Sequence, residues 1–128
     1  MNRGADWFRQ AEADLRAAED SVVTTHYEWA AFQAQQAAEK AVKALVQFLH
    51  GAVRGHSITE ILQQLPASAR APQTILEAAR QLDKVYLTAR SPNGFVSGIP
   101  SDYFTEKDGR EHIGHARSIL EFCRSQIH

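Results

Sequence analysis

Residues 32–46 read FQAQQAAEKAVKALV, and this stretch decides the fold. Seven of the fifteen positions from 30 to 44 are alanine, which favours helix more than any other residue, and none is glycine or proline. At ~100° per residue, one wide face collects Ala34, Ala37, Ala38, Ala41, Val42, Ala44, Leu45, Phe48 and Leu49. Because alanine lets neighbouring helices approach closely, the pattern predicts the central helix of a compact bundle.

The opposite face of this helix is a narrow polar stripe formed by Gln36, Lys40, Lys43 and Gln47. Trp29 and Phe32 continue the stripe toward the N-terminus, where large apolar side chains are out of place. We therefore expect something outside the primary core to cover both rings.

Four further segments carry apolar residues three or four positions apart, as amphipathic helices do. The first is predicted over residues 5–23. A short one is announced by the capping box Ser57-x-x-Glu60 and stops at Pro66. The next begins at or after Pro72 and runs as one helix through residue 86 and beyond.

The last helix opens at Thr105, with Asp108 three residues on. No segment alternates with period two, which argues against a sheet. The predicted fold class is all-α, an antiparallel up-and-down bundle of four main helices plus one short helix. Residues 91–104 form a long loop with two prolines and two glycines, and its apolar side chains are expected to pack on the bundle or on another subunit.

Composition limits the function further. A chain of 128 residues, 44% apolar, fits a single domain over residues 1–128. The net charge of −1 excludes a broad basic field for nucleic acid, so any such contact must be local. The single cysteine, Cys123, leaves no internal disulfide, and neither a signal segment nor a membrane-length apolar run is present. We expect a cytoplasmic protein.

Three motifs together resemble the HEPN domain family of small prokaryotic helical proteins. They are FxAQQAAEKAxKA at 32–44, GHS at 55–57 and LDxxYxxxRxPN at 82–93. The resemblance covers nearly the whole chain. It departs at Arg90-Ser-Pro-Asn93, where the family typically reads Arg-Tyr-Pro-Asp, so this chain lacks an aromatic ring and a negative charge there.

The resemblance implies a bundle that forms a homodimer and works beside a minimal nucleotidyltransferase of the MNT type, in a toxin–antitoxin-like pair. Some relatives are metal-independent ribonucleases with an Arg-x(4–6)-His motif shared between two subunits. Others are taken to bind nucleotides or only the partner. For the homodimer we expect an interface that includes Trp29 and Phe32, or apolar residues of the 91–104 loop.

Arg110 and His115 satisfy the Arg-x4-His spacing. Five residues on a helix rotate by ~500°, so the two side chains point ~140° apart and could meet only across a two-fold axis. Histidine would then transfer protons and arginine would stabilise phosphorane charge. Glu111 inside the motif would repel phosphate, and we favour a solvent-exposed helix face over a ribonuclease site.

Asp83, Tyr86 and Arg90 are spaced i, i+3 and i+7, which places them within ~60° on one helix. One interpretation is a structural cluster in which the carboxylate and the guanidinium flank the phenol. The other makes Arg90 a phosphate clamp helped by Lys40 or Lys43, and the same aspartate could hold the arginine.

The sequence predicts no metal site and no cofactor. His112 and His115 could share a metal, but no third ligand is placed by sequence. The leading hypothesis is a binding module for a nucleotide or RNA end, with a nucleotidyltransferase partner. The alternative is the metal-independent ribonuclease at Arg110 and His115, and a scaffold without ligand is a third possibility.

Overall fold

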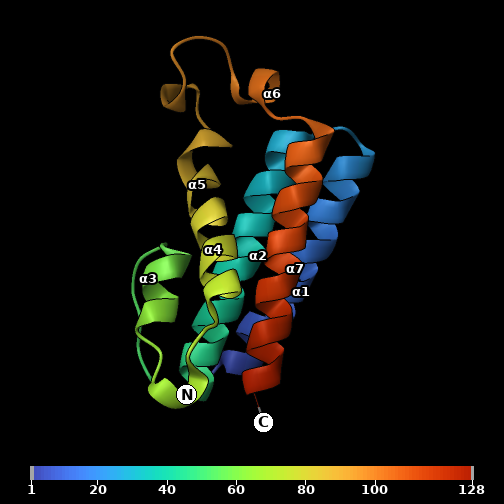
Figure 1. Ribbon diagram of the computed structural model, residues 1–128. Coiled ribbons are helices and arrows are strands. Elements are labelled where there is room, and N and C mark those ends of the chain that lie inside the picture. The colour runs from blue at the N-terminus through green and yellow to red at the C-terminus, as the bar shows by residue number, and fades with distance from the viewer. Residues whose placement is uncertain (1, 128) are drawn as a thin grey trace.

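The computed structural model describes residues 2–127 and contains helices but no strand within that range. The elements follow the order α1 (Gly4–Val23), α2 (Tyr27–Phe48), α3 (Ile58–Gln63), η1 (Ala67–Ala69), α4 (Gln73–Asp83), α5 (Val85–Thr88), η2 (Pro92–Gly94), α6 (Pro100–Tyr103) and α7 (Glu106–Gln126). Long helices α1, α2, α4 and α7 run up and down side by side, and both chain ends lie at one end of the bundle (Figure 1). The predicted all-α antiparallel bundle is confirmed.

Helix α2 is the central element, as its alanines predict. It packs against α1 and α7 along its length and also contacts α3, α4 and α5. Seven of its alanines are fully inaccessible to solvent: Ala30, Ala31, Ala34, Ala37, Ala38, Ala41 and Ala44. Because the side chain at each of these positions is a single methyl group with no solvent around it, the neighbouring helices lie close to the α2 backbone.

Both α1 and α2 end on a non-glycine residue in the left-handed conformation. Thr25 has φ 65° and His50 has φ 61°. In each case the following amide closes the last turn, from His26 onto the Ser21 carbonyl and from Gly51 onto the Val46 carbonyl. Helix α2 thus stops at Phe48, and Leu49, predicted on the core face, is the C-cap residue within the closing turn and is 38% exposed.

Helix α3 begins at Ser57, whose hydroxyl accepts a hydrogen bond from the Glu60 amide. The predicted reciprocal bond from the Glu60 side chain is absent among residues 2–127. The remaining amides of the first turn are instead bound by Asp83, from the end of α4. The capping box is therefore half correct: Ser57 caps the helix, whereas a carboxylate distant in sequence, and not Glu60, binds the other first-turn amides.

The single helix predicted from Pro72 onward is divided. Helix α4 ends at Asp83, Lys84 separates the two parts, and α5 continues through Thr88. The following segment, 91–104, forms two short helical turns joined by a stack of Phe95 on Tyr103, with ring centroids 4.2 Å apart. This segment is therefore a folded connection at one end of the bundle (Figure 1).

The end of α2 that carries Trp29 and Phe32 has a small apolar cluster of its own. Ala31, Val85 and Ala89 are buried there, and Phe32 and Phe104 pack against them. Phe32 is therefore covered by α5 and the loop before α7, as expected. Trp29 remains 46% exposed, although its ring meets Phe32 edge-on at 6.1 Å.

Candidate functional site

Arg90, just after α5, lies over two aromatic rings. Its guanidinium carbon is 4.4 Å from the centroid of Tyr86 and 5.2 Å from that of Phe32. Cation–π contacts of this kind hold the guanidinium plane in place without using its N–H donors. Arg90 makes none of the ion pairs found among residues 2–127, and it is exposed. Its donors therefore face solvent, in a fixed position.

His56 extends this aromatic group. Its ring stacks on Tyr86 with centroids 4.8 Å apart and an angle of 19° between the planes. Its Nδ1 lies 3.0 Å from Glu39 Oε2. With Nδ1 bonded to a carboxylate, Nε2 is the ring nitrogen left for a ligand. The side chain is 57% exposed, so a ligand can reach it.

Glu39 is a buried acid of α2 and links both sides of the site. Its carboxylate accepts bonds from Gln35 Nε2 at 3.0 Å and Lys43 Nζ at 2.9 Å, in addition to the contact with His56. The residue is only 5% exposed. A buried carboxylate needs such partners, because leaving it unpaired away from water is costly. Glu39 thereby fixes Lys43 and His56 relative to α2.

Asp83 does not hold Arg90. Its carboxylate accepts from the Ile58 amide at 2.8 Å, the Thr59 amide at 3.1 Å, Thr59 Oγ1 at 2.7 Å and Ser57 Oγ at 3.2 Å. This is an anion at a helix N-terminus, where free amides and the helix dipole both favour it. The expected bracket of aspartate and arginine around Tyr86 is thus corrected: Asp83 fastens α3 to α4.

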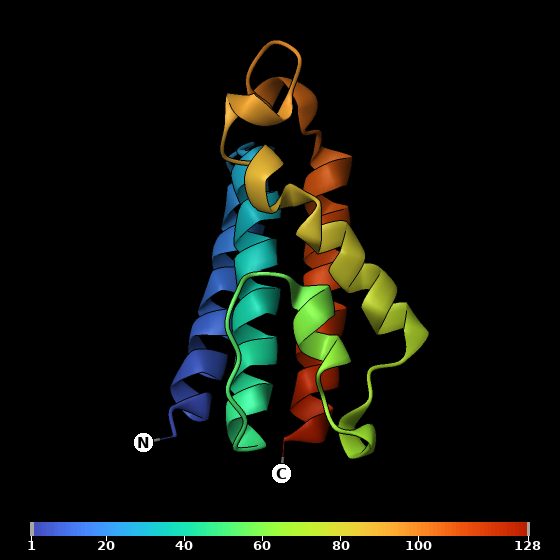
Figure 2. The ribbon, with the colours of Figure 1, turned by 90° about the vertical axis from the view of Figure 1, so that its left-hand side faces the viewer.

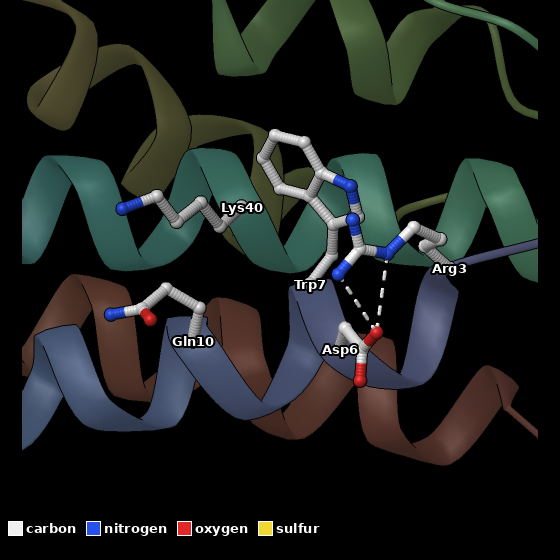
Figure 3. Close-up of a pocket in the computed structure, with 5 residues that line it drawn as sticks. All are labelled: Arg3, Asp6, Trp7, Gln10 and Lys40. Carbon is white, nitrogen blue, oxygen red and sulfur yellow. Dashed lines mark hydrogen bonds and ion pairs between the residues drawn. The ribbon is translucent and has the colours of Figure 1, made fainter.

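The two lysines of α2 lie on the side of the helix that faces α1. Lys40 pairs with Asp14 of α1 and lines a hollow of about 340 Å³ with Arg3, Asp6, Trp7 and Gln10 (Figure 3). Lys43 lines an adjoining hollow of about 280 Å³, which Trp7 also borders. Lys40 therefore lies apart from Arg90, and Lys43 is linked to it through Glu39, His56 and Tyr86.

Arg110 and His115 both lie on α7, as predicted. Arg110 is exposed, and its Nε donates to Glu106 Oε2 at 2.7 Å. His115 is half-buried, and burial, with a smaller contribution from nearby His112, lowers the pKa of its imidazole. His112 Nδ1 in turn donates to the Asp108 carbonyl at 2.7 Å. Within one chain the arginine is engaged by a glutamate and not by the histidine.

Three participants of this surface were not singled out as site residues from the sequence: Glu39, His56 and Trp7. Glu39 carried a usable signal, because an acid inside an alanine-rich helix must find a partner. His56 was marked by the GHS motif, but the sequence favoured a packing or capping role for it, and its stacking partner comes from α5. Trp7 carried no such signal, since its neighbours in the hollow include Lys40 of α2. In residues 2–127 no group of three or more His, Cys, Asp or Glu side chains could hold a metal. The same range includes no helix with the length and apolar character needed to cross a membrane.

Comparison with known proteins places this geometry in a family. Residues 5–126 match the model of the HEPN domain. The chain belongs to the HEPN domain family. Putative toxin MJ1304 of Methanocaldococcus jannaschii is 24% identical in an alignment of 128 positions that covers 92% of this chain and 84% of that protein.

Three solved structures share the fold. TT1696 from Thermus thermophilus superposes with a TM-score of 0.96 and 38% identity, covering 98% of this chain and 99% of that one. ST0689, an archaeal HEPN homologue, gives 0.86 and 42% with all of both chains covered. A HEPN domain protein from Thermotoga maritima gives 0.75 and 28%, covering 94% and 95%.

Proposed function

We propose that this HEPN protein is a binding module that takes a phosphate-bearing nucleotide or RNA end at Arg90 and pairs with an MNT-type minimal nucleotidyltransferase. Its likeness to Putative toxin MJ1304 supports a role in a toxin–antitoxin-like pair. The observation that carries the binding role is the guanidinium of Arg90, which is exposed, oriented by Tyr86 and Phe32, and without a carboxylate partner among residues 2–127.

The chemistry of the cluster suits a nucleotide. A guanidinium can donate two parallel hydrogen bonds to a phosphate, and the exposed His56 ring offers a base the face turned away from Tyr86. Nε2 of His56, on the same aromatic group, adds a polar contact. Because the net charge is −1, affinity must come from these few contacts and not from a general positive field.

Arg90→Gln tests the site. We expect it to weaken binding of AMP and of a short 5′-phosphorylated RNA at least tenfold, by calorimetry and fluorescence anisotropy, while the melting temperature changes by less than about 2 °C. Arg80→Gln on the exposed face of α4 removes the same charge away from the aromatic cluster and should change neither quantity. The assignment of Arg90 as the binding residue is refuted if Arg90→Gln and Arg80→Gln bind the ligands equally well. It is also refuted if Arg90→Gln greatly lowers the melting temperature while binding per folded molecule stays intact.

The partner is tested separately. We expect a short nucleotidyltransferase gene beside this one, whose purified product forms a complex of defined stoichiometry with this chain in size-exclusion chromatography with light scattering. A mixture that elutes as two separate proteins at tens of micromolar contradicts the pairing. That result leaves ligand binding at Arg90 as a separate question.

The homodimer remains part of the proposal. Exposed apolar side chains gather at the end of the bundle that carries α6: Trp29 is 46% exposed, Val96 fully, Ile99 52% and Tyr103 47%. Exposed apolar side chains that gather at one place on a protein suit a contact with another chain. Light scattering should give twice the 14.3 kDa chain mass, and Val96→Asp together with Ile99→Asp should give the monomer. A wild-type monomer at tens of micromolar refutes it.

A second candidate function is metal-independent RNA cleavage by Arg110 of one copy and His115 of the other. The lowered pKa of His115 favours it in one respect, because a neutral imidazole can accept a proton near pH 7. The Glu106 pair opposes it by occupying Arg110. RNA cleavage that persists in EDTA and disappears in both His115→Ala and Arg110→Ala would place this function first. We expect little cleavage by the wild type.

A further inference from the structure

The hollow beside Trp7 points to the size and kind of the ligand. We propose that the ligand bound at Arg90 is an unpaired RNA strand of about five nucleotides or more, which runs along α2 and stacks one base on the Trp7 indole. This inference rests on the proposed function, and it adds a second contact region at the opposite end of α2. Figure 2 shows α1 and α2 side by side, with the segment that leads to α3 running in front of α2.

Trp7 stands between two hollows and is only half-buried. On one side lies the space bordered by Arg3, Asp6, Gln10 and Lys40, and on the other the space bordered by Lys43 and residues 51–53. The indole lies over α2 with Arg3 beside it (Figure 3). An aromatic ring with space beside it and cations around it is the arrangement by which proteins stack an unpaired base and bind its phosphate.

The cations around Trp7 are held in place but keep free donors. Arg3 pairs with Asp6, Lys40 with Asp14 and Lys43 with Glu39. An ammonium has three N–H donors and a guanidinium five, so one carboxylate leaves several for a phosphate. Each pair is neutral overall, which agrees with a site that needs a stacked base as well as a phosphate.

The Trp7 region is connected to Arg90 by consecutive contacts. Lys43 and His56 both contact the Glu39 carboxylate. His56 stacks on Tyr86, and the Arg90 guanidinium lies over the Tyr86 ring. From Phe32 beneath Arg90 to Lys43 beside Trp7, α2 rises ~16 Å at ~1.5 Å per residue. A stacked strand at ~3.4 Å per nucleotide covers that distance with about five nucleotides.

The strand must be unpaired. Both ends of this track offer a ring face, at Trp7 on one side and, on the other, at the exposed His56 ring on the face turned away from Tyr86. Bases within a duplex stack on each other and cannot place their faces on side chains, whereas an unpaired strand can. A mononucleotide can reach only one end of the track, so length should increase affinity.

The experiment uses the full chain, an eight-nucleotide oligoadenylate and AMP. The sequence has two tryptophans, so Trp29→Phe makes Trp7 the only indole. In that background we expect the oligonucleotide to quench Trp7 fluorescence and AMP not to do so. Trp7→Leu should weaken oligonucleotide binding about 5- to 150-fold, the range for one stacked base, and leave AMP affinity within twofold.

A second variant covers the possibility that Trp7→Leu fails to fold. Lys40→Gln, which alters only one side of the hollow, should weaken the oligonucleotide several-fold and lower the slope of log K against log salt by ~0.7. Arg9→Gln is the matched control, because Arg9 is exposed on α1 and borders neither hollow. It should leave binding within twofold.

The outcomes separate the two proposals. If the oligonucleotide and AMP bind equally well, Arg90→Gln weakens both, and neither Trp7→Leu nor Lys40→Gln changes either, the extended strand is wrong and the Arg90 site stands. If neither ligand binds at 1 mM, the proposed function fails, and this inference fails with it. Loss of oligonucleotide binding alone in the Trp7 and Lys40 variants supports the strand along α2.

Discussion

Asp83 gives the most direct test of how this bundle is held together. Its carboxylate binds two backbone amides at the start of α3 and two nearby hydroxyls. In Asp83→Ala, the Ser57 and Thr59 hydroxyls can turn to water, whereas the Ile58 and Thr59 amides lose their acceptor. An amide left unpaired costs roughly 1–3 kcal/mol, so we expect Asp83→Ala to lower the free energy of unfolding by about 2–4 kcal/mol.

Urea titration followed by circular dichroism measures this loss. With a slope of about 2 kcal/mol per molar urea, the middle of the usual range, the midpoint should fall by roughly 1–2 M. Asp83→Asn keeps one acceptor oxygen but loses the charge, so it should cost about half as much. Neither change should alter ligand affinity per folded molecule, because the carboxylate faces α3 and not Arg90.

Glu60→Ala is the matched control. The sequence pattern assigns Glu60 the capping role, whereas the structure gives that role to Asp83. We expect Glu60→Ala to change the free energy of unfolding by less than ~0.5 kcal/mol. The reasoning is refuted if Glu60→Ala costs as much as Asp83→Ala, or if Asp83→Ala leaves the midpoint unchanged.

Three further predictions concern α7. Gly114→Ala should raise the free energy of unfolding by about 0.5–1 kcal/mol, since an added Cβ meets nothing within 4 Å. Gly109→Ala should raise it less, because its Cβ would lie 3.3 Å from Val22. Urea unfolding midpoints of the two variants measure this difference. The folded-state pKa of His115 is lowered, so below pH ~6.5 the unfolded chain binds more protons than the folded one. The free energy of unfolding therefore falls as pH falls through the folded-state pKa. His115→Gln should lose less stability than wild type between pH 7 and 5, and an identical loss would contradict this. Burial raises the pKa of the Cys123 thiol to about 12, so it should react with a thiol reagent at pH 8 only after denaturant is added, and rapid reaction of the native protein would show that α7 opens.

The fold was largely predictable because its signals are local. The alanine content of 30–44 identified the central helix, and Ser57, Thr105 and Asp108 marked where two helices begin. Thr105 and Asp108 form the complete capping box at the start of α7, since both partners lie within one turn. Such short-range bonds depend on sequence spacing alone.

The site was less predictable because its contacts join distant segments. The spacing of Asp83, Tyr86 and Arg90 implied one helical face, but the helix is interrupted at Lys84. Asp83 precedes the interruption, whereas Tyr86 and Arg90 follow it. Asp83 then meets α3, 24 to 26 residues earlier in the chain. The contact of His56 with Glu39 likewise spans 17 residues. No periodicity within one helix can reveal such pairs.

The alanine-lined α2 has a consequence for the order in which the chain folds. Only residues 24–26 separate α1 from α2, so these two helices can pair after closing a very short loop, whereas α7 must return from about 60 residues further along the chain. Alanine loses no side-chain rotamer entropy on burial, so this first pairing has a low entropic cost. We expect enlarging Ala34 to slow folding and truncating Ile119 on α7 mainly to speed unfolding, so that α1 and α2 form the folding nucleus and α7 completes the bundle last.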